Sequence, residues 1–198
     1  MKHPSSRDLF TYWTKQRGTR PAPDRADIEP GDIRHALGDI FMLAADFVEE
    51  QHFRLAGTRV CALFGREIKG ESFSAAFGPA SRQELRAMLT EVIGESAGLV
   101  AGVNGRNAEH ETVELELLLL PLAHKGHARI RAIGVLAAHE TPYWIGERPI
   151  KDLALGTVRH IGAQTEPPKS FLPALEARLR RSFRVYQGGL GKPNEKAG

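Results

Sequence analysis

The chain has 198 residues, of which 41% are hydrophobic, so it can build one substantial core and is short for two. Its apolar runs fall well short of the roughly 20 residues that a membrane-crossing helix needs, and its start lacks the apolar stretch of a signal peptide. We therefore expect a cytoplasmic protein. A single cysteine, Cys61, excludes an intramolecular disulfide and any zinc site built from several cysteines.

The net charge of +3 is unevenly distributed along the chain. Residues 168–198 hold seven basic and two acidic side chains, a net charge of +5, which leaves residues 1–167 at −2. Only the C-terminal part is therefore attracted to phosphates, anionic lipid or an acidic partner. We divide the chain into an N-terminal flanking helix (1–20), a central domain (21–165) and a basic, partly flexible C-terminal tail (166–198).

The N-terminal flank is predicted to be an amphipathic helix over residues 5–17. Ser5 can cap its first turn and Gly18 can end it. The segment TRPAPDRADIEPGD follows, and its prolines and aspartates are typical of a loop.

Two short runs rich in Ile, Phe, Leu and Val come next, at residues 38–47 and 51–57. A polar stretch separates them, which predicts two strands in a hairpin. Short helical pieces are predicted at residues 58–64 and 71–77, because glycines break the chain into turns around them.

A helix over residues 81–97 is the clearest prediction. Ser81 and Glu84 match a capping box, and Gly98 stands where a left-handed cap would end the helix. The apolar side chains recur at helical spacing, at Leu85, Met88, Leu89, Val92 and Ile93.

Three strands are predicted after this helix, at residues 99–103, 112–122 and 129–138. In the second strand, apolar residues alternate with Glu114 and Glu116, so we expect one buried face and one solvent-exposed face. A closing helix is predicted over residues 152–161. The order of these elements predicts an α+β fold, in which five antiparallel strands form a sheet with helices packed on one face.

The run FRLAGTRVCALFGREIKGESF, residues 53–73, resembles the part of PAS domains that leads from the second strand through the short helices. With the YW…RG helix before it and the DIEPGDI segment, the chain is similar to the PAS_5 family of stand-alone alphaproteobacterial proteins over about residues 5–165. This resemblance implies a curved five-stranded sheet with a small internal cavity, in domains that bind small ligands, dimerise or pass signals to partners. The pattern L-F-G-x-x-x-x-G-x-x-F appears as Leu63, Phe64, Gly65, Gly70 and Phe73.

The common catalytic motifs are absent, including the nucleophile elbow, the zinc-protease motif and the phosphate-binding and dinucleotide-binding loops. His124 and His127 are close in sequence, but their polar predicted turn supplies no further metal ligands. Cys61 lies outside the N-C-R-F context of flavin photosensors of this fold, so a buried, inert thiol is the better interpretation. His52 and His110 keep a weak hypothesis of haem binding open. We predict a non-catalytic protein with no cofactor and no metal.

A mostly apolar cavity is predicted between the helix at residues 81–97 and the concave face of the sheet, and it suits apolar or aromatic ligands. Arg54 could bind a carboxylate there, or it could point to solvent. The alternative is that the same side chains simply pack as core. The candidate pocket residues are Phe53, Arg54, Leu55, Phe64, Met88, Val92, Leu115, Leu117 and Ile133.

Two further surfaces are candidates for partner binding. We favour a homodimer interface over packing on the chain's own sheet for the aromatic helix surface of Phe10, Tyr12 and Trp13. Our leading hypothesis is a sensory or adaptor PAS domain that binds a small ligand or a protein partner in signalling, with no membrane contact. The alternative is an effector that binds a cyclic dinucleotide or nucleic acid through the tail, at Arg178, Arg180, Arg181 and Arg184.

Overall fold

The computed structural model describes residues 1–45, 50–95, 97–123 and 130–161. Two compact units divide the chain, Met1–Ala163 and Gln164–Gly198, and the second lies outside the described residues. The predicted basic tail falls in this second unit. In the part of the chain that is described, no helix combines the length and the apolarity needed to cross a bilayer.

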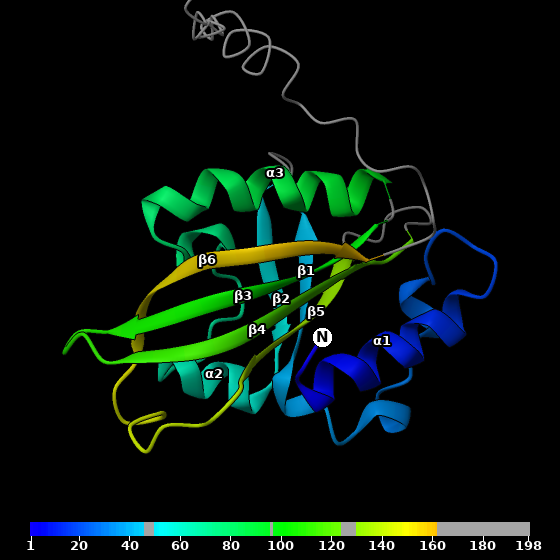
Figure 1. Cartoon of the computed structure of the whole chain (residues 1–198). Helices are drawn as coiled ribbons and strands as arrows, with labels where there is room; N and C mark the ends of the chain where they lie inside the picture. The colour runs from blue at the N-terminus through cyan, green and yellow to red at the C-terminus, as the bar shows by residue number, and fades with distance from the viewer. Residues whose placement is uncertain (46–49, 96, 124–129, 162–198) are drawn as a thin grey trace, which may run out of the picture. The chain divides into compact units, whose positions relative to one another are not determined.

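The described strands form one antiparallel sheet in the order β2-β1-β5-β4-β3-β6 (Figure 1). The predicted hairpin of β1 and β2 and the predicted run of β3, β4 and β5 are both present. Pairing of β1 with β5 joins these two parts, so the sheet has one continuous core on each face. The strands are β1 Ile40–Ala45, β2 Gln51–Ala56, β3 Gly98–Asn107, β4 Thr112–Pro121, β5 Ile130–Ala138 and β6 Ile150–Ile161.

Strand β6 corrects the prediction of five strands and of a closing helix at residues 152–161. It pairs with β3, and a β-bulge interrupts the pairing. Val158 lies opposite Ala101, whereas Leu155 lies opposite Val103, so three residues along β6 match two along β3. The bulge breaks the strict alternation by which a strand is recognised in a sequence, and pairing with a distant strand decides the conformation instead.

Helical segments cover one side of the sheet, here called the inner face. The short helix α2 has its predicted bounds, and α3 confirms the predicted long helix. Ser81 lies inside the first turn of α3 and does not cap it; its Oγ accepts a hydrogen bond from the Leu155 backbone N–H at 2.9 Å. The helical segments of the inner face are α2 Thr58–Phe64, η4 Ser74–Ala76 and α3 Pro79–Glu95.

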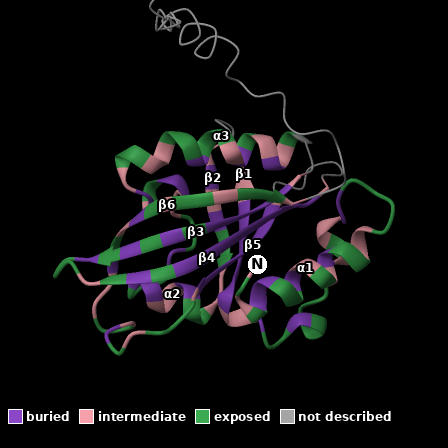
Figure 2. Cartoon of the chain, viewed as in Figure 1, coloured by how far each residue is buried: buried purple, intermediate pink, exposed green. Residues whose placement is uncertain are grey.

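The N-terminal helix α1, Pro4–Arg17, covers the opposite, outer face of the sheet. Leu9 and Trp13 are buried there, and the Trp13 Nε1–H donates a hydrogen bond to the Pro121 carbonyl at 2.8 Å. Both buried and exposed residues occur along α1 (Figure 2). Helices therefore cover both faces of the sheet. Three short 3₁₀ turns continue this outer layer, at η1 Arg25–Asp27, η2 Pro30–Ile33 and η3 Leu37–Asp39.

The first turn of α1 is tied to the rest of the domain. His3 caps the helix in place of the predicted Ser5, because its Nδ1 accepts a hydrogen bond from the Ser5 N–H at 3.2 Å. The Ser5 hydroxyl donates to the buried carboxylate of Asp39 at 2.6 Å. Asp39 also accepts from Arg59 Nε and Nη2, at 2.7 and 2.8 Å. Gly18 ends the helix as predicted, with a φ of 57°.

Glu116 corrects the prediction of a solvent-exposed face on β4. The side chain points to the outer face as expected, but the start of α1 covers it and leaves it 5% exposed. Its carboxylate accepts hydrogen bonds from the backbone N–H groups of Lys2 at 2.6 Å and His3 at 3.1 Å. Burial raises the pKa of Glu116, but these hydrogen bonds, the Ser6 side chain and the charge of the N-terminus together outweigh burial and hold the pKa below its ordinary value of 4.5.

Candidate functional site

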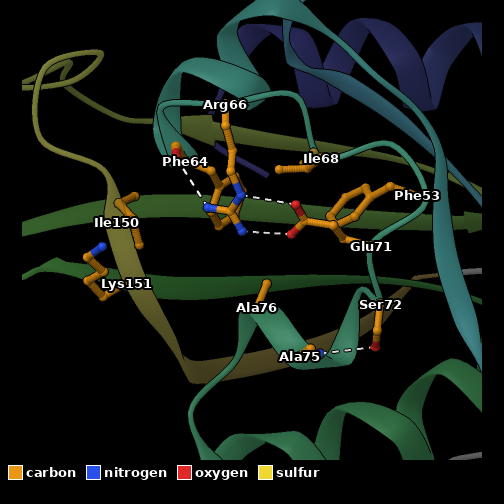
Figure 3. Close-up of a pocket in the computed structure, with 10 residues that line it drawn as sticks. All are labelled: Phe53, Phe64, Arg66, Ile68, Glu71, Ser72, Ala75, Ala76, Ile150 and Lys151. Carbon is orange, nitrogen blue, oxygen red and sulfur yellow. Dashed lines mark hydrogen bonds and ion pairs between the residues drawn. The ribbon is translucent and has the colours of Figure 1, made fainter.

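A cavity of about 330 Å³ lies where β2, α2, η4 and β6 come together (Figure 3). Strands β2 and β6 are the opposite edges of the sheet, yet both supply lining residues. The pocket therefore depends on the tertiary structure and cannot arise from one segment of the chain. The lining residues are Phe53, Phe64, Arg66, Ile68, Glu71, Ser72, Ala75, Ala76, Ile150 and Lys151.

The deep part of the pocket is apolar. Phe53, Phe64, Ile68 and Ile150 are all buried and belong to the inner-face core. A ligand that touches them would replace water against four apolar side chains, which is favourable in proportion to the area that it covers.

Two glycines shape the loop that carries four of the ten lining residues. Gly65 ends α2 with a φ of 64°, and Gly70 has a φ of 88°. Both lie in the left-handed region, which glycine adopts without the steric cost of a Cβ. Between these turns the chain buries Ile68 and leaves Arg66 exposed, so one short loop supplies both an apolar and a charged group to the pocket.

The exposed rim carries an ion pair between Arg66 and Glu71. Arg66 Nε lies 3.0 Å from one carboxylate oxygen of Glu71, and Nη2 lies 2.7 Å from the other (Figure 3). The hydrogen bonds to Glu71 raise the pKa of Arg66 above its ordinary value. The two side chains are 56% and 43% exposed, and pairs this open stabilise a fold by only about 0–1 kcal/mol.

The backbone beside this ion pair is joined to the edge strand β2. The Phe53 N–H donates to the Glu71 carbonyl at 3.0 Å, and the Gly70 N–H donates to the Phe53 carbonyl at 2.7 Å. The Phe73 N–H donates to the Gln51 carbonyl at 2.8 Å. A shift of the Glu71 backbone would therefore act directly on β2.

A second polar cluster fixes the other end of this loop. The hydroxyls of Ser72 and Ser74 each donate to the same oxygen of Glu50 at 2.6 Å, and Arg86 of α3 lies 3.2 Å from the second oxygen. Burial raises the pKa of Glu50, but the hydrogen bonds from both serines and the charge of Arg86 outweigh it and lower the pKa. The pocket loop is thus connected to α3 as well as to β2.

The structure separates the predicted pocket residues into three places. Phe53, Phe64, Val92, Leu115 and Leu117 lie together in the inner-face core, with Met88 packed at its margin. These residues are packed as core, the alternative that the sequence left open, and only Phe53 and Phe64 also line the described pocket.

The remaining predicted pocket residues face elsewhere. Ile133 lies opposite Leu120 in the outer-face core, because side chains alternate along a strand and its neighbours Ala132 and Leu136 take the inner side. Arg54 and Leu55 are exposed, so neither reaches the inner-face core. Ile133 and Leu55 therefore do not take the predicted inner-face position, whereas Arg54 takes the solvent-facing alternative that the sequence left open.

The predicted dimer surface on α1 is largely used within the chain. Trp13 is 1% exposed and packs on the outer-face core, which leaves it no surface for a second copy. The Tyr12 hydroxyl donates to the Asp27 carbonyl at 3.1 Å and accepts from the Glu29 N–H at 2.8 Å. Phe10 is half-buried, with its ring stacked on Trp13 at a centroid distance of 6.4 Å.

Other candidates from the sequence give no site in the described residues. His124 and His127 lie outside them, as do the four tail arginines. No group of three metal-ligating side chains occurs in the described part of the chain. Cys61 is only half-buried, and burial together with the nearby Glu67 carboxylate raises the pKa of its thiol.

Sequence reasoning missed the polar half of the pocket. Arg66 lies in a stretch predicted as turns and Glu71 begins the helical piece predicted at residues 71–77, and neither pattern distinguishes a pocket rim from an ordinary surface. Ile150 and Lys151 were missed because β6 itself was not predicted. The available signal was the pair of glycines, Gly65 and Gly70, around a basic residue.

The fold defines a class of protein: an antiparallel sheet with short helices and one long helix packed on its inner face is the architecture of a PAS sensory domain. A family model described as PAS domain, PAS_5, matches residues 1–137. The protein therefore belongs to the PAS_5 family of PAS domains, as the sequence resemblance predicted, and to their class of sensory signalling domains.

Several solved structures are similar at low identity. The LOV protein of Rhodobacter sphaeroides is 18% identical, covers 52% of this chain and 60% of its own length, and has a TM-score of 0.41. A PAS domain from Colwellia psychrerythraea is 9% identical, with 56% of this chain and 97% of that chain covered and a TM-score of 0.40. An RNA-binding light-oxygen-voltage receptor is 18% identical, with coverages of 59% and 35% and a TM-score of 0.39. No curated protein matches the chain.

The chain spans about 60% of the length of the R. sphaeroides LOV protein. The family match, and not these distant likenesses, assigns the domain.

Proposed function

We propose that this protein is a cytoplasmic, non-catalytic signalling domain whose input is a small molecule bound in the pocket between α2, η4 and β6. The observation that carries the proposal is a cavity of about 330 Å³ with a buried apolar floor and a charged rim. Ligand pockets commonly have volumes of about 300–1,000 Å³ and combine apolar walls with a few polar groups.

The position of the pocket supports a role in signalling. A ligand there would contact Ile150, the first residue of β6, and β6 continues to Ile161 at the end of the described domain. It would also contact the loop that is joined to β2 by backbone hydrogen bonds and to α3 through Glu50. Occupancy of the pocket would therefore bias three elements, and a protein partner could read any of them.

Filling the cavity tests the proposal. Ala76 lines the pocket and is half-buried, so Ala76→Phe should occupy the space without adding charge. Ala80, exposed in the first turn of α3 and absent from the lining, provides the matched control Ala80→Phe. Native mass spectrometry should detect any co-purified molecule, and thermal shift should report binding from a library of neutral and anionic aromatic compounds.

We expect ligands to bind the wild type and the Ala80→Phe variant but not the Ala76→Phe variant. Circular dichroism melts should show that both variants fold. A wild-type protein that carries no molecule and responds to no compound would contradict the proposal, and so would ligands that bind the Ala76→Phe variant equally well.

A homodimer remains part of the proposed function. Of the three aromatic residues predicted for the interface, Phe10 offers the most suitable surface, because Trp13 is buried and the Tyr12 hydroxyl is held by two backbone groups. Phe10→Glu should shift a dimer to a monomer in sedimentation velocity without loss of helix content. A dimer that persists in this variant would place the interface elsewhere.

The alternative function uses the tail. Its support is the charge of residues 168–198, which is +5, and the four arginines at Arg178, Arg180, Arg181 and Arg184. Replacing all four with glutamine should remove binding of cyclic dinucleotide or single-stranded RNA and flatten its salt dependence. Binding that is unchanged would remove this alternative.

A further inference from the structure

We propose that the ligand of this pocket is a small carboxylate with an apolar body, and that its carboxylate replaces the carboxylate of Glu71 on Arg66. The inference rests on the proposed function, because it names the chemical class that the same pocket accepts. Glu71 is then a built-in competitor that occupies the anion position while the pocket is empty.

The geometry of Arg66 supports a carboxylate ligand. Its guanidinium presents Nε and Nη2 to the two oxygens of Glu71, at 3.0 and 2.7 Å, which is the two-point arrangement that a guanidinium makes with a carboxylate. A ligand carboxylate can take the same position with the same hydrogen bonds. Since the exchange replaces one carboxylate by another, no charge on Arg66 is left unpaired.

The exposure of the ion pair makes this exchange accessible. Arg66 and Glu71 are 56% and 43% exposed, so a released Glu71 side chain turns into water and keeps its hydration. By contrast, a buried carboxylate would lose its partners and remain unsolvated on release. The rim pair is thus weak enough to open for a competing ligand.

The charges of the lining favour an anion. Arg66 and Lys151 are its cations, Glu71 is its anion, and Lys151 makes no ion pair among the residues that the structure describes. The neighbouring acidic groups are already engaged: Asp152 pairs with Arg106, and Glu50 accepts from two serines. When Glu71 leaves, two cations face the pocket.

The apolar floor determines the chemical character of the ligand beyond its carboxylate. Phe53, Phe64, Ile68 and Ile150 form the buried side of the cavity, and they lie around the Arg66 guanidinium and the Glu71 carboxylate (Figure 3). A benzyl group or a short branched chain matches these side chains in polarity and size. Phenylacetate combines this body with a carboxylate, and phenylacetamide has nearly the same shape without the charge.

The test is an NMR titration of the full chain with phenylacetate and with phenylacetamide. We expect phenylacetate to bind more tightly. Arg66→Gln should weaken phenylacetate binding by about 10- to 100-fold, because it removes charge-assisted hydrogen bonds. Glu71→Gln should tighten it by about two- to fivefold, because it removes the competitor of a weak exposed pair. Neither variant should change phenylacetamide binding as much.

A matched control separates this effect from a general change in charge. Arg20 makes a similarly exposed pair with Asp27 at 2.8 Å and is not among the pocket residues, so Arg20→Gln should leave both affinities unchanged. Circular dichroism melts should show that all three variants fold.

Two results would overturn the inference. If the acid and the amide bind the wild type equally and neither rim variant changes their ratio, the carboxylate is not recognised, although the proposed ligand pocket stands when Ala76→Phe abolishes both. If phenylacetate binds neither the wild type nor Glu71→Gln, the pocket does not take this class of ligand. The proposed function itself then fails only if the compound library is also without a hit.

Discussion

Two carboxylates, Glu116 and Glu71, occupy contrasting positions on the two sides of the sheet. Glu116 is 5% exposed and accepts two backbone hydrogen bonds that hold the start of α1. Glu71 is 43% exposed and pairs with Arg66 on the rim of the pocket. No solvent or ligand can reach the buried Glu116 carboxylate to replace its partners. The Glu71 carboxylate, by contrast, borders both solvent and the cavity.

The difference shows that hydrogen-bond geometry alone does not separate structural from functional polar groups. Both carboxylates have partners within about 3 Å. The cost of losing these partners differs, because a buried charge without partners is destabilising by several kcal/mol and an exposed pair is worth about 0–1 kcal/mol. The outer face is therefore built for stability, and the rim of the pocket can respond to a ligand.

The largest expected effect is on the outer face. Trp13→Ala should lower the free energy of unfolding by about 3–5 kcal/mol, because it leaves a cavity beneath α1 and removes the hydrogen bond to the Pro121 carbonyl. Urea unfolding measures the loss. If Trp13→Ala does not fold, Trp13→Phe should still show a smaller loss. A loss below 1 kcal/mol for Trp13→Ala would mean that α1 is not part of the folded domain.

Glu116→Gln should have the next largest effect. The amide nitrogen cannot accept a hydrogen bond from the Lys2 or His3 N–H, so we expect a loss of about 1–3 kcal/mol at pH 7. The exposed Glu114 of the same strand supplies the control, since Glu114→Gln should change stability by less than about 0.5 kcal/mol. Equal losses in both variants would contradict the buried anchor.

The pH dependence of stability tests whether the buried Glu116 carboxylate stabilises the fold in its charged form. The folded-state pKa of Glu116 lies below its ordinary value of 4.5, so its stabilising contribution is complete above that pH and is lost as the pH falls through the folded-state pKa. Glu116→Gln should therefore lose less stability than the wild type between pH 5 and the acid transition. Parallel pH profiles for the two proteins would show that Glu116 does not titrate with folding.

The rim variants should have small effects on stability. Arg66→Gln and Glu71→Gln should each change the free energy of unfolding by less than about 1 kcal/mol, because both side chains are about half exposed. The same urea experiment measures them beside Glu116→Gln. A loss as large as that of Glu116→Gln would make the rim pair a structural contact and weaken the case for ligand exchange.

The smallest expected effect concerns Cys61 on α2. Burial raises the pKa of its thiol, and the nearby Glu67 carboxylate raises it further. Glu67→Gln should therefore lower that pKa and modestly speed alkylation by iodoacetamide at pH 8, where the thiolate is the reactive form. An unchanged rate would mean that access, and not charge, limits the reaction.

Local patterns predicted those elements whose periodicity is complete within one segment. The apolar spacing of Leu85, Leu89 and Val92 predicted α3, and the glycine after Phe64 predicted the end of α2. The family resemblance was carried by the same local run and was confirmed over residues 1–137. About half of the predicted pocket residues lie in the inner-face core, but only Phe53 and Phe64 line the described cavity.

The face of the sheet to which a side chain points was harder to predict than the helices and strands themselves. Strand β5 is apolar on both sides, so its sequence does not tell whether Ile133 faces the inner or the outer core, and packing of α1 decides it. The same helix buries Glu116, whose alternation with leucines predicted solvent. In both cases a segment more than 100 residues away supplies the missing surface.

The amino-acid sequence determined the class of this protein, because helix periodicity, turn glycines and the run at residues 53–73 act locally. Only the tertiary structure decided that β6 pairs with β3 and that Ile150 and Lys151 of β6 line the same pocket as Phe53 of β2. The physical reason is that a pocket built from both edges of one curved sheet depends on contacts between segments far apart in the chain, and no local pattern encodes those contacts.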